Sequence, residues 1–422
     1  MNPLYIVDAI RTPFTKAGST LASLDAVDLG RAAVTALLTR TGIDPGVIDE
    51  TIFGCVGQPA HAQNIARVIA LRSGVPDSKP AMTVHRNCAS GLEAITTAHQ
   101  RICADQGQVF LVGGTESMSN MPFYFQKPAV EKFTALARSK SLPQKAHAVA
   151  SFRAADFSPV IGLELGLTDP VAEMNMGRTA ELLAREFSIS REAQDAFALR
   201  SHLRAAQNAG VLAEEIAPVY PTEGEPVLTD NGIRADATVE RLAQLRPIFD
   251  RRYGSVTAGN SSQITDGAVA LLVCSEKALA LHGWEPLGKL THYAATGCEP
   301  ERMGLGPVRA MDAVLQRAKL RLDDIDLFEI NEAFAAQVLA VLKCLQDESA
   351  ARRAGLESPL GELDPARLNV AGGAIALGHP VGASGARLVL TALRQMKSCG
   401  HKRSLISLCV GGGQGVAAIL ET

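Results

Sequence analysis

The sequence lacks several features that mark particular classes of protein. Its eight cysteines include no Cys-x-x-Cys pair, which argues against a zinc ribbon or a thioredoxin-type site. No run of about 18 apolar residues occurs, so we expect no transmembrane helix. The first residues show no basic region followed by an apolar run, so we expect no signal peptide. A formal net charge of −3 predicts no nucleic-acid partner.

The composition that is present describes a globular protein with more than one domain. Hydrophobic residues make up 47% of the chain and charged residues 20%, which is typical of soluble globular proteins. A chain of 422 residues exceeds one ordinary hydrophobic core, so we expect two or three domains. The cysteines are scattered along the chain, which fits reduced thiols and a cytoplasmic location.

Three short motifs recur in the same order in the two ends of the chain. They are residues 48–49 with 325–326, 89–91 with 383–385, and 111–114 with 408–413. A repeated order of this kind predicts a duplicated α/β half. Strand and helix patterns alternate within each half, so we expect a mostly parallel sheet with both faces covered.

The repeat also predicts the domain boundaries. Residues 1–119 with 247–285 form the predicted N-terminal half, and residues 286–422 form the C-terminal half. Residues 120–246 have no counterpart, and we interpret them as an inserted loop domain that carries binding groups and oligomer contacts. The polar stretch 347–365 is expected to be a surface excursion.

The first part of the insertion, 122–158, combines basic and aromatic residues. Lysines and arginines outnumber acidic residues there, and Phe123, Tyr124, Phe125 and Phe133 lie among them. Such a segment suits contact with a membrane surface or a partner protein. A solvated lid or an oligomer contact is the simpler alternative.

Cys88 is the first candidate for chemistry. A β-leaning stretch leads up to it, and a helical pattern begins at Gly91. The cysteine therefore lies at or just before a helix N-terminus, where unpaired N–H groups and the helix dipole favour a thiolate. The alternative is a small buried core cysteine without reactivity.

Three further candidates lie in the second half. Asn331 follows a predicted strand, His379 stands among small apolar residues, and Cys409 ends a strand just before Gly411. The repeat places the Cys88 loop opposite the His379 loop. A cysteine beside a histidine is an activated nucleophile, a second cysteine can move a proton, and backbone N–H groups of a glycine turn can stabilise an oxyanion. Taken one at a time, these residues also have purely structural explanations. His379 could be a core histidine, Cys409 a strand residue, and Gly411 part of a turn.

Together, eight motifs in order resemble the thiolase family over nearly the whole chain. They are Arg11-Thr12-Pro13-Phe14, Asn87-Cys88-Ala89-Ser90-Gly91-Leu92, Val256-Thr257-Ala258-Gly259-Asn260-Ser261-Ser262, Asp266-Gly267-Ala268, Met303-Gly304-Leu305-Gly306-Pro307-Val308, Asn331-Glu332-Ala333-Phe334, Gly378-His379-Pro380 and Cys409-Val410-Gly411-Gly412-Gly413. The resemblance implies an α/β thiolase fold, in which duplicated αβα halves form a five-layer αβαβα core with an inserted loop domain.

The resemblance also implies a role for each candidate. Cys88 is expected to take the acyl group as a thioester, and His379 to activate it and to help bind the thioester oxygen. Asn331 is expected to hold the water of that oxyanion hole. Cys409 is expected to act as the acid and base at the α-carbon. The N–H groups of Cys88 and Gly411 are expected to form a second oxyanion hole.

The same resemblance places the substrate. It implies that Arg234 and Ser262 contact coenzyme A, and that Met176, Met303 and Phe334 line the acyl pocket. It implies no bound cofactor and no metal, with coenzyme A and acyl-CoA as substrates.

The predicted activity is that of a 3-ketoacyl-CoA thiolase, an acetyl-CoA C-acyltransferase of fatty-acid β-oxidation with ping-pong kinetics. An acetyl-CoA acetyltransferase that condenses two acetyl-CoA molecules is the alternative. A non-catalytic lipid-carrier or scaffold protein and a Cys–His hydrolase are remoter hypotheses. Asn175 stands where many short-chain biosynthetic thiolases carry histidine.

The resemblance implies a homodimer or homotetramer as the assembly. A hydratase–dehydrogenase subunit is a further partner hypothesis, because the insertions are similar to those of thiolase subunits in bacterial β-oxidation complexes. Those subunits often carry histidine where this chain has Asn331.

Overall fold

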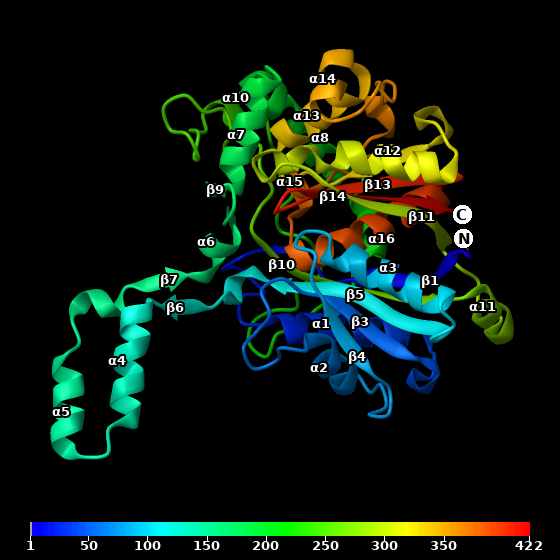
Figure 1. The fold of residues 1–422 in the computed structure, drawn as a ribbon. Helices are drawn as coiled ribbons and strands as arrows, with labels where there is room; N and C mark the ends of the chain where they lie inside the picture. The colour runs from blue at the N-terminus through cyan, green and yellow to red at the C-terminus, as the bar shows by residue number, and fades with distance from the viewer. Residues whose placement is uncertain (1) are drawn as a thin grey trace. The chain divides into compact units, whose positions relative to one another are not determined.

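The computed structural model describes residues 2–422, so the first residue of the predicted segment 1–119 lies outside the described residues (Figure 1). The chain divides into two compact units, which we describe separately. The larger contains the residues up to 120 and from 169 onward, and the smaller is Met121–Thr168. The predicted loop segment 120–246 thus spans both units. Within residues 2–422, none of the helices has both the length and the apolar character that a membrane span requires.

The two halves of the larger unit are built from strands in matching order. In the N-terminal half these strands are β1 (Leu4–Arg11), β3 (Glu50–Gly54), β4 (Ala81–Val84), β5 (Val109–Ser117) and β10 (Thr265–Cys274). In the C-terminal half they are β11 (Gly288–Gly297), β12 (Leu327–Ile330), β13 (Arg403–Val410) and β14 (Gln414–Glu421).

Strand pairing confirms the predicted duplication. The parallel pair β3–β5 matches the parallel pair β12–β13. The antiparallel neighbours β5–β10 and β10–β1 match β13–β14 and β14–β11. Strand β1 also pairs with β11 through Leu4–Ile6, so the hydrogen-bonded path runs continuously from one half into the other.

The expectation of a mostly parallel sheet was wrong. Among the strands of the large sheet in residues 2–422, the parallel pairs are β3 with β4 and β5, and β12 with β13, and the remaining pairs are antiparallel. The reason is local in the C-terminal half, because only residues 411–413 join β13 to β14, and such a short connection permits only antiparallel pairing. All residues of β5 and β10 are nevertheless buried, so both faces of the sheet are covered as expected.

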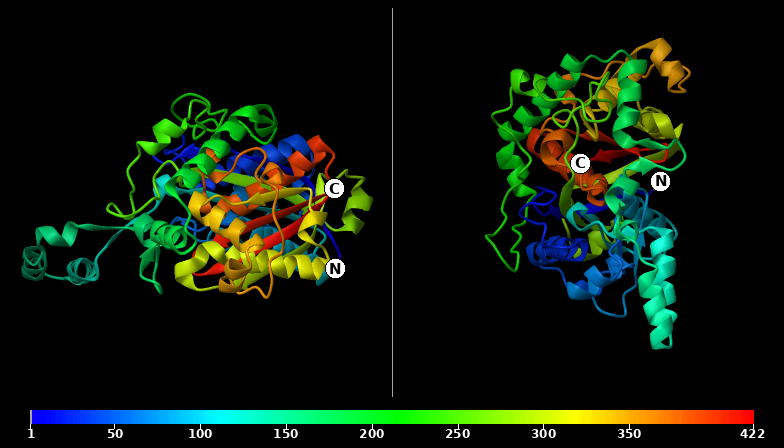
Figure 2. Two further views of the ribbon diagram at one scale, coloured as in Figure 1. Left: turned by 90° about the horizontal axis from the view of Figure 1, so that it is seen from above. Right: turned by 90° about the vertical axis from the view of Figure 1, so that its left-hand side faces the viewer.

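Helices cover the strands in three layers. Helices α1 (Ala26–Thr41) and α2 (Ile65–Arg72) pack on the outer face of the N-terminal half, and α12 (Gly306–Ala318) packs on that of the C-terminal half. Between the halves lie α3 (Ser90–Cys103) and α16 (Val381–Cys399). Figures 1 and 2 show the resulting αβαβα stack, which confirms the predicted fold class.

The two central helices approach each other at repeat-related glycines. A Cβ on Gly91 of α3 would lie 2.8 Å from the backbone nitrogen of Ala386, and one on Gly385 of α16 would lie 2.6 Å from that of Leu92. Neither position has room for a side chain. The first turns of α3 and α16 are therefore in direct backbone contact, which fixes what the loops before them can meet.

The other helices of the larger unit pack mostly against its C-terminal half, except for the helix Glu276–His282, which packs against β1. Its remaining helices of five or more residues are α7 (Met176–Glu186), α8 (Arg191–Gln207), α9 (Ala209–Glu214), α10 (Val239–Ala243), α11 (Glu276–His282), α13 (Ala335–Gln346) and α14 (Glu348–Arg353). The segment 347–365 is not simply a surface excursion, because Ala350, Ala351, Leu356 and Leu363 are buried in the core of this half. These apolar side chains lie among the charged residues that suggested full exposure.

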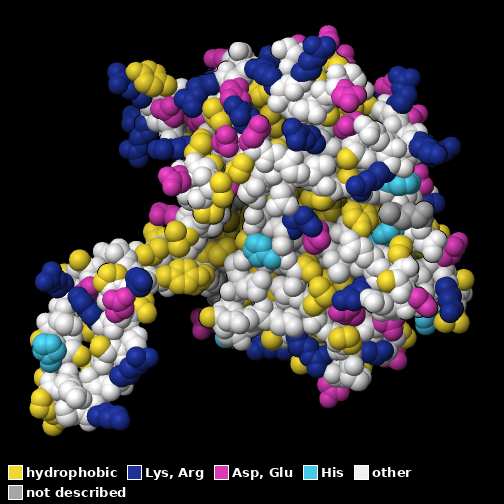
Figure 3. Space-filling model, viewed as in Figure 1, with side chains coloured by type: hydrophobic (Ala, Val, Ile, Leu, Met, Phe, Trp, Pro, Cys, Tyr) yellow, Lys and Arg dark blue, Asp and Glu magenta, His cyan; other side chains and the backbone are white. Residues whose placement is uncertain are grey.

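The smaller unit is a helical hairpin on a short ribbon. Helices α4 (Lys127–Arg138) and α5 (Leu142–Ala150) pack together, and β6 (Phe123–Phe125) pairs with β7 (Pro159–Ile161). Aromatic rings form its small core, with Phe133 at 5.0 Å from Phe125 and at 4.8 Å from Phe152 between ring centroids. Other apolar side chains of this unit are exposed on its surface, as Figure 3 shows among its lysines and arginines.

Candidate active site

Cys88 and His379 occupy matching places in the two halves. Each lies two residues before a central helix, Cys88 before α3 and His379 before α16. Because the first turns of these helices touch, both loops open at the same seam between the halves. The predicted position of Cys88 just before a helix N-terminus is confirmed.

Cys88 is half-buried, and the backbone N–H groups of Gly411 and of Cys88 itself lie near its sulfur. Burial raises the pKa of the Cys88 thiol to about 11, while the N–H groups of Gly411 and of Cys88 itself act to lower it. The carboxyl of Glu116 adds to the rise. The resting group is therefore a neutral thiol at neutral pH, so it needs a base before it can act as a nucleophile.

The His379 ring is held in one tautomer. Its Nδ1 lies 2.5 Å from Oγ of Ser384, and that hydroxyl donates to the Pro380 carbonyl at 3.0 Å. Ser384 must then accept the Nδ1 proton, which leaves Nε2 without a hydrogen. Burial, with Arg387 nearby, lowers the pKa of His379 to about 3, so the ring is neutral. It presents a bare Nε2, the form that a general base requires.

Asn331 is directed at the same nitrogen. Its Nδ2 lies 3.4 Å from His379 Nε2, and the residue is fully buried at the end of β12. Among the hydrogen bonds of residues 2–422, Oδ1 of Asn331 has no partner. A buried amide oxygen in this state is suited to bind a water or a substrate donor.

Cys409 lies in an apolar cluster with the residues that were predicted to line the acyl pocket. It forms one buried cluster with Met303 and Ala333, and Met176 and Phe334 pack against that cluster. Burial, with a further contribution from Cys88, raises the pKa of the Cys409 thiol well above its usual range. The thiol is thus neutral and can act as a proton donor. The structure brings together Cys409 and all three residues predicted to line the pocket.

Arg234 is not part of the Cys409 cluster and lines a separate cavity of about 220 Å³. His202, Arg241 and Gln263 also line this cavity, and Nδ1 of His202 accepts the Arg234 backbone N–H at 3.3 Å. Ser262, the other predicted coenzyme A contact, directly precedes Gln263 in the chain. Its backbone N–H donates to Ala333, which belongs to the Cys409 cluster. Ser262 thus adjoins the cavity through Gln263 and the Cys409 cluster through Ala333.

Sequence reasoning missed three residues that shape this site. Ser384 sets the His379 tautomer. The buried Glu116 accepts N–H groups of Val56 and Gly57 and also that of Gly382 in α16, and so joins the halves. Asn87 directly precedes Cys88 in the chain. Each belongs to a quoted motif or a strand end, but only the fold shows what its side chain contacts.

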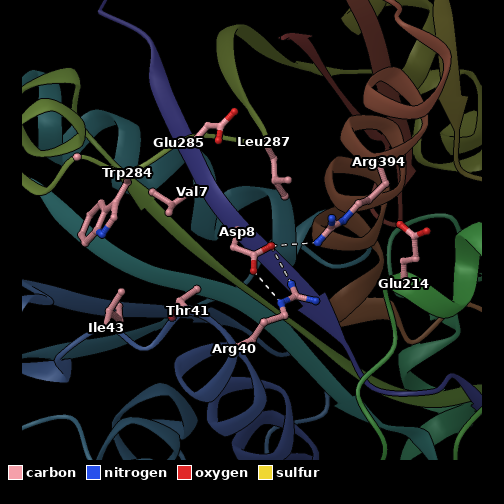
Figure 4. Close-up of a pocket in the computed structure, with 11 residues that line it drawn as sticks. Val7, Asp8, Arg40, Thr41, Ile43, Glu214, Trp284, Glu285, Leu287 and Arg394 are labelled. Atoms are coloured by element: carbon pink, nitrogen blue, oxygen red, sulfur yellow. Dashed lines mark hydrogen bonds and ion pairs between the residues drawn. The ribbon is translucent and has the colours of Figure 1, made fainter.

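A surface hollow elsewhere carries no comparable chemistry. There Asp8 is paired with Arg40 at 2.7 Å and with Arg394 at 3.1 Å, and Trp284 stands nearby (Figure 4). The two guanidinium groups already share one carboxylate between β1, α1 and α16. We assign this cluster to holding these elements together.

Comparison with protein families identifies the class of enzyme and then the family. The family models "Thiolase, N-terminal domain" and "Thiolase, C-terminal domain" match residues 4–277 and 284–422. By class the chain is an acyltransferase. The chain belongs to the thiolase family.

Individual relatives align with this chain over nearly their full length. A probable acetyl-CoA acyltransferase of Staphylococcus epidermidis is 39% identical, with 100% of this chain and 99% of the relative aligned. A 3-ketoacyl-CoA thiolase of Yersinia enterocolitica is 38% identical, with 99% and 96% aligned.

Solved structures show the same similarity. The Bacillus anthracis acetyl-CoA acetyltransferase has a TM-score of 0.87 at 34% identity, with 100% of this chain and 99% of that chain covered. Human mitochondrial 3-ketoacyl-CoA thiolase in complex with CoA has a TM-score of 0.86 at 37% identity, with 100% and 98% covered.

Proposed function

We propose that the chain is a 3-ketoacyl-CoA thiolase, which cleaves a 3-oxoacyl-CoA with coenzyme A to acetyl-CoA and a shortened acyl-CoA. One observation carries the proposal. A cysteine with two backbone N–H groups near its sulfur lies beside a second cysteine, which is buried in an apolar cluster. An acyl group needs a nucleophile and an oxyanion hole, and a carbanion leaving group needs a neutral acid.

In the first half-reaction His379 Nε2 takes the Cys88 thiol proton and the sulfur attacks the 3-oxo carbon. The N–H groups of Cys88 and Gly411 hold the oxyanion. The bond between C2 and C3 then breaks, and its electron pair leaves as the enolate of acetyl-CoA. His379 and a water held by Asn331 stabilise the enolate oxygen, and Cys409 delivers the proton to carbon.

In the second half-reaction free coenzyme A attacks the thioester on Cys88. Cys409 takes the thiol proton of coenzyme A, and the same pair of N–H groups holds the oxyanion. Collapse of the intermediate breaks the bond to Cys88 sulfur, which recovers a proton through His379. Two substrates thus react in turn, which predicts ping-pong kinetics.

We assign coenzyme A to the cavity lined by Arg234, where a guanidinium suits a phosphate. Ser262 is assigned to the pantetheine arm, and its place next to Gln263 of that cavity and its backbone bond to Ala333 of the Cys409 cluster support this assignment. The acyl chain is assigned to Met176, Met303 and Phe334. Methionine side chains adapt to chains of differing length.

The direct test is the substitution Cys88→Ser. Mixed with acetyl-CoA, the unmodified protein should gain an acetyl group on Cys88, detected by intact mass and peptide mapping. The variant should lose this adduct and lose thiolysis by a factor on the order of 10³ or more. Cys103→Ser, which alters an exposed cysteine on α3, is the matched control. Normal turnover by Cys88→Ser would overturn the proposal.

Condensation of two acetyl-CoA molecules is the second candidate, favoured by the structural similarity to an acetyl-CoA acetyltransferase. One observation bears on it. Asn175, at the position where many short-chain biosynthetic thiolases carry histidine, accepts the Gly177 N–H at 2.9 Å and caps α7. Its side chain is thus engaged with backbone. Thiolysis rates from acetoacetyl-CoA to a long-chain 3-oxoacyl-CoA separate the candidates, since a condensing enzyme should favour the shortest.

The assembly and partners follow as further proposals. We propose a homodimer or homotetramer, measurable by analytical ultracentrifugation. Exposed side chains such as Phe123, Tyr124 and Leu142 on the smaller unit support a contact with a membrane surface or with another subunit. Flotation with vesicles and co-purification with a hydratase–dehydrogenase subunit test those two contacts. The cytoplasmic location and fatty-acid β-oxidation stay predictions.

A further inference from the structure

Two consecutive residues before Cys88 tie its loop to the glycine turn of the opposite half. Asn87 Nδ2 donates to the Gly411 carbonyl at 2.7 Å. Arg86 donates from Nη1 to the side-chain oxygen of Gln414 at 3.0 Å. These two hydrogen bonds hold the two ends of the turn between β13 and β14. They cross the seam between the N-terminal and C-terminal halves.

The Cys88 side of this connection is rigid. The Arg86 guanidinium is paired with both carboxylate oxygens of Glu93 on α3, at 2.6 and 3.1 Å. A bidentate pair leaves the arginine little freedom. The backbone N–H of Arg86 also donates to Oγ of Ser90 at 2.9 Å. The loop is therefore anchored on its own helix before it reaches across.

The backbone of Asn87 is unusual in a way that serves the contact. Its φ is +43°, in the left-handed region that asparagine tolerates better than most residues. This conformation directs the side chain over Gly411, where a Cβ on the glycine would lie 3.6 Å from Asn87 Nδ2 and 3.6 Å from Met176 Sδ. Strained backbone is kept where surrounding contacts hold it.

The glycine turn between β13 and β14, on the other side of the seam, needs contacts that hold its backbone in place. Gly412 and Gly413 have φ of +88° and +77°, so the turn consists of residues with the widest conformational freedom. The N–H of Gly411 belongs to this turn, while Cys88 belongs to the other half. The Gly413 carbonyl accepts the Cys298 N–H at 2.8 Å within the C-terminal half, and the bonds from Arg86 and Asn87 join the turn to the Cys88 loop.

We propose that Asn87 is a positioning residue that holds the Gly411 N–H against the Cys88 sulfur and so sets the geometry of the oxyanion hole. Its kinetic consequence rests on the proposed thiolase function. Its geometric consequence does not, because the state of the Cys88 thiol is measurable without any acyl substrate.

The test uses Asn87→Gly, which keeps the left-handed backbone at low cost and removes only the side chain. Two measurements are made at pH 8. The rate of Cys88 acetylation by acetyl-CoA should fall roughly tenfold to a hundredfold, because one donor of the oxyanion hole is displaced. The rate of Cys88 alkylation by iodoacetamide should fall as well, because the thiolate loses a donor. The KM for coenzyme A should not change.

Two further variants keep the test decisive. Asn87→Asp preserves size and backbone preference but cannot donate, so it should show the same two losses if Asn87→Gly does not fold. Lys319→Gly changes another left-handed residue, with φ of +56° at the end of α12, and should leave both rates unchanged.

The possible results separate the two proposals. Unchanged acetylation and alkylation in Asn87→Gly would overturn the positioning role. Slower acetylation with unchanged alkylation would also overturn it, since Asn87 would then act on the substrate. If the unmodified protein takes no acetyl group, the thiolase function fails, and the alkylation rates alone still decide whether Asn87 positions Gly411.

Discussion

The side-chain nitrogen of Asn331 lies 3.4 Å from Nε2 of His379. These residues come from the end of a strand and from the loop before a central helix, and both are buried. Ser384 contacts the same ring at Nδ1. Ser384 thus holds the ring at Nδ1, and Asn331 lies beside Nε2, the nitrogen that acts as the base in the proposed mechanism.

Ser384→Ala should weaken catalysis without removing any group that touches the substrate. The Nδ1 proton would lose its acceptor, so the ring could adopt the other tautomer with Nε2 protonated. A hydrogen bond that supports a developing charge contributes about 1.5–3 kcal/mol, so kcat should fall roughly tenfold to a hundredfold. Thiolysis kinetics with a pH profile measure this. Ser398→Ala, near the C-terminal end of the same helix, should behave as the unmodified protein.

Cys409→Ala should separate the two chemical steps. Cys88 should still be acetylated at a reduced rate, since its base and oxyanion hole remain and only the proton for the leaving coenzyme A thiolate is lost. Exchange of the methyl protons of acetyl-CoA with deuterated water should fall by about 10²–10⁴, the usual contribution of a general acid or base. Nuclear magnetic resonance of the methyl group follows the exchange. Full exchange in this variant would assign the proton transfer to another group.

Met303→Ala should shift chain-length preference. Met303 is buried beside Cys409, so its truncation enlarges the apolar pocket. The kcat/KM for long-chain relative to four-carbon substrates should rise. Removal of a buried methionine side chain should also cost about 2–5 kcal/mol of stability. Met311→Ala, in the core of the C-terminal half, should show a similar loss of stability without the change in preference.

His202→Gln should make the protein less sensitive to acid. Burial, followed by the charge of Arg234, lowers the pKa of His202 to about 4 from 6.5. The unfolded chain binds a proton at His202 more tightly than the folded protein does. The contribution of the neutral, buried ring to the free energy of unfolding is therefore full above about pH 6.5 and is lost as the pH falls through 4. The unmodified protein should lose roughly 2 kcal/mol through this group between pH 7 and pH 5. Denaturant titrations at both pH values measure the difference.

The matched control for that prediction is His147→Gln. This histidine is exposed on α5, so its replacement should leave the pH dependence of unfolding as it was. An equal loss of stability in His202→Gln and in the unmodified protein would contradict the expected role of burial at His202.

Much of the fold could be predicted because the two halves of the sequence contain the same motifs in the same order. The repeat of Ala-Ser-Gly at 89–91 and 383–385 predicts two equivalent helix starts, and the contacts of Gly91 and Gly385 confirm their pairing. The direction of the strands could not be predicted, because parallel and antiparallel strands buried on both faces have the same apolar pattern.

The sequence could identify those candidate residues whose side chains are themselves reactive. Cys88, His379 and Cys409 have reactive side chains. Ser384 and Asn87 act through what they contact, and those contacts join positions that the sequence separates, such as Asn87 with Gly411. The residue types alone carry no signal of this. The roles of all these residues remain predictions.

The order of the strands along the chain has a consequence for biosynthesis. Strand β5 has β10 as its antiparallel neighbour, and residues 118–264 are translated between them. At roughly 5–20 residues per second, the ribosome needs on the order of 10 s to supply that partner. One edge of β5 stays unpaired on the nascent chain for this time. We therefore expect newly made N-terminal segments to depend on chaperones, whereas the hairpin of β13 and β14 closes as soon as it emerges.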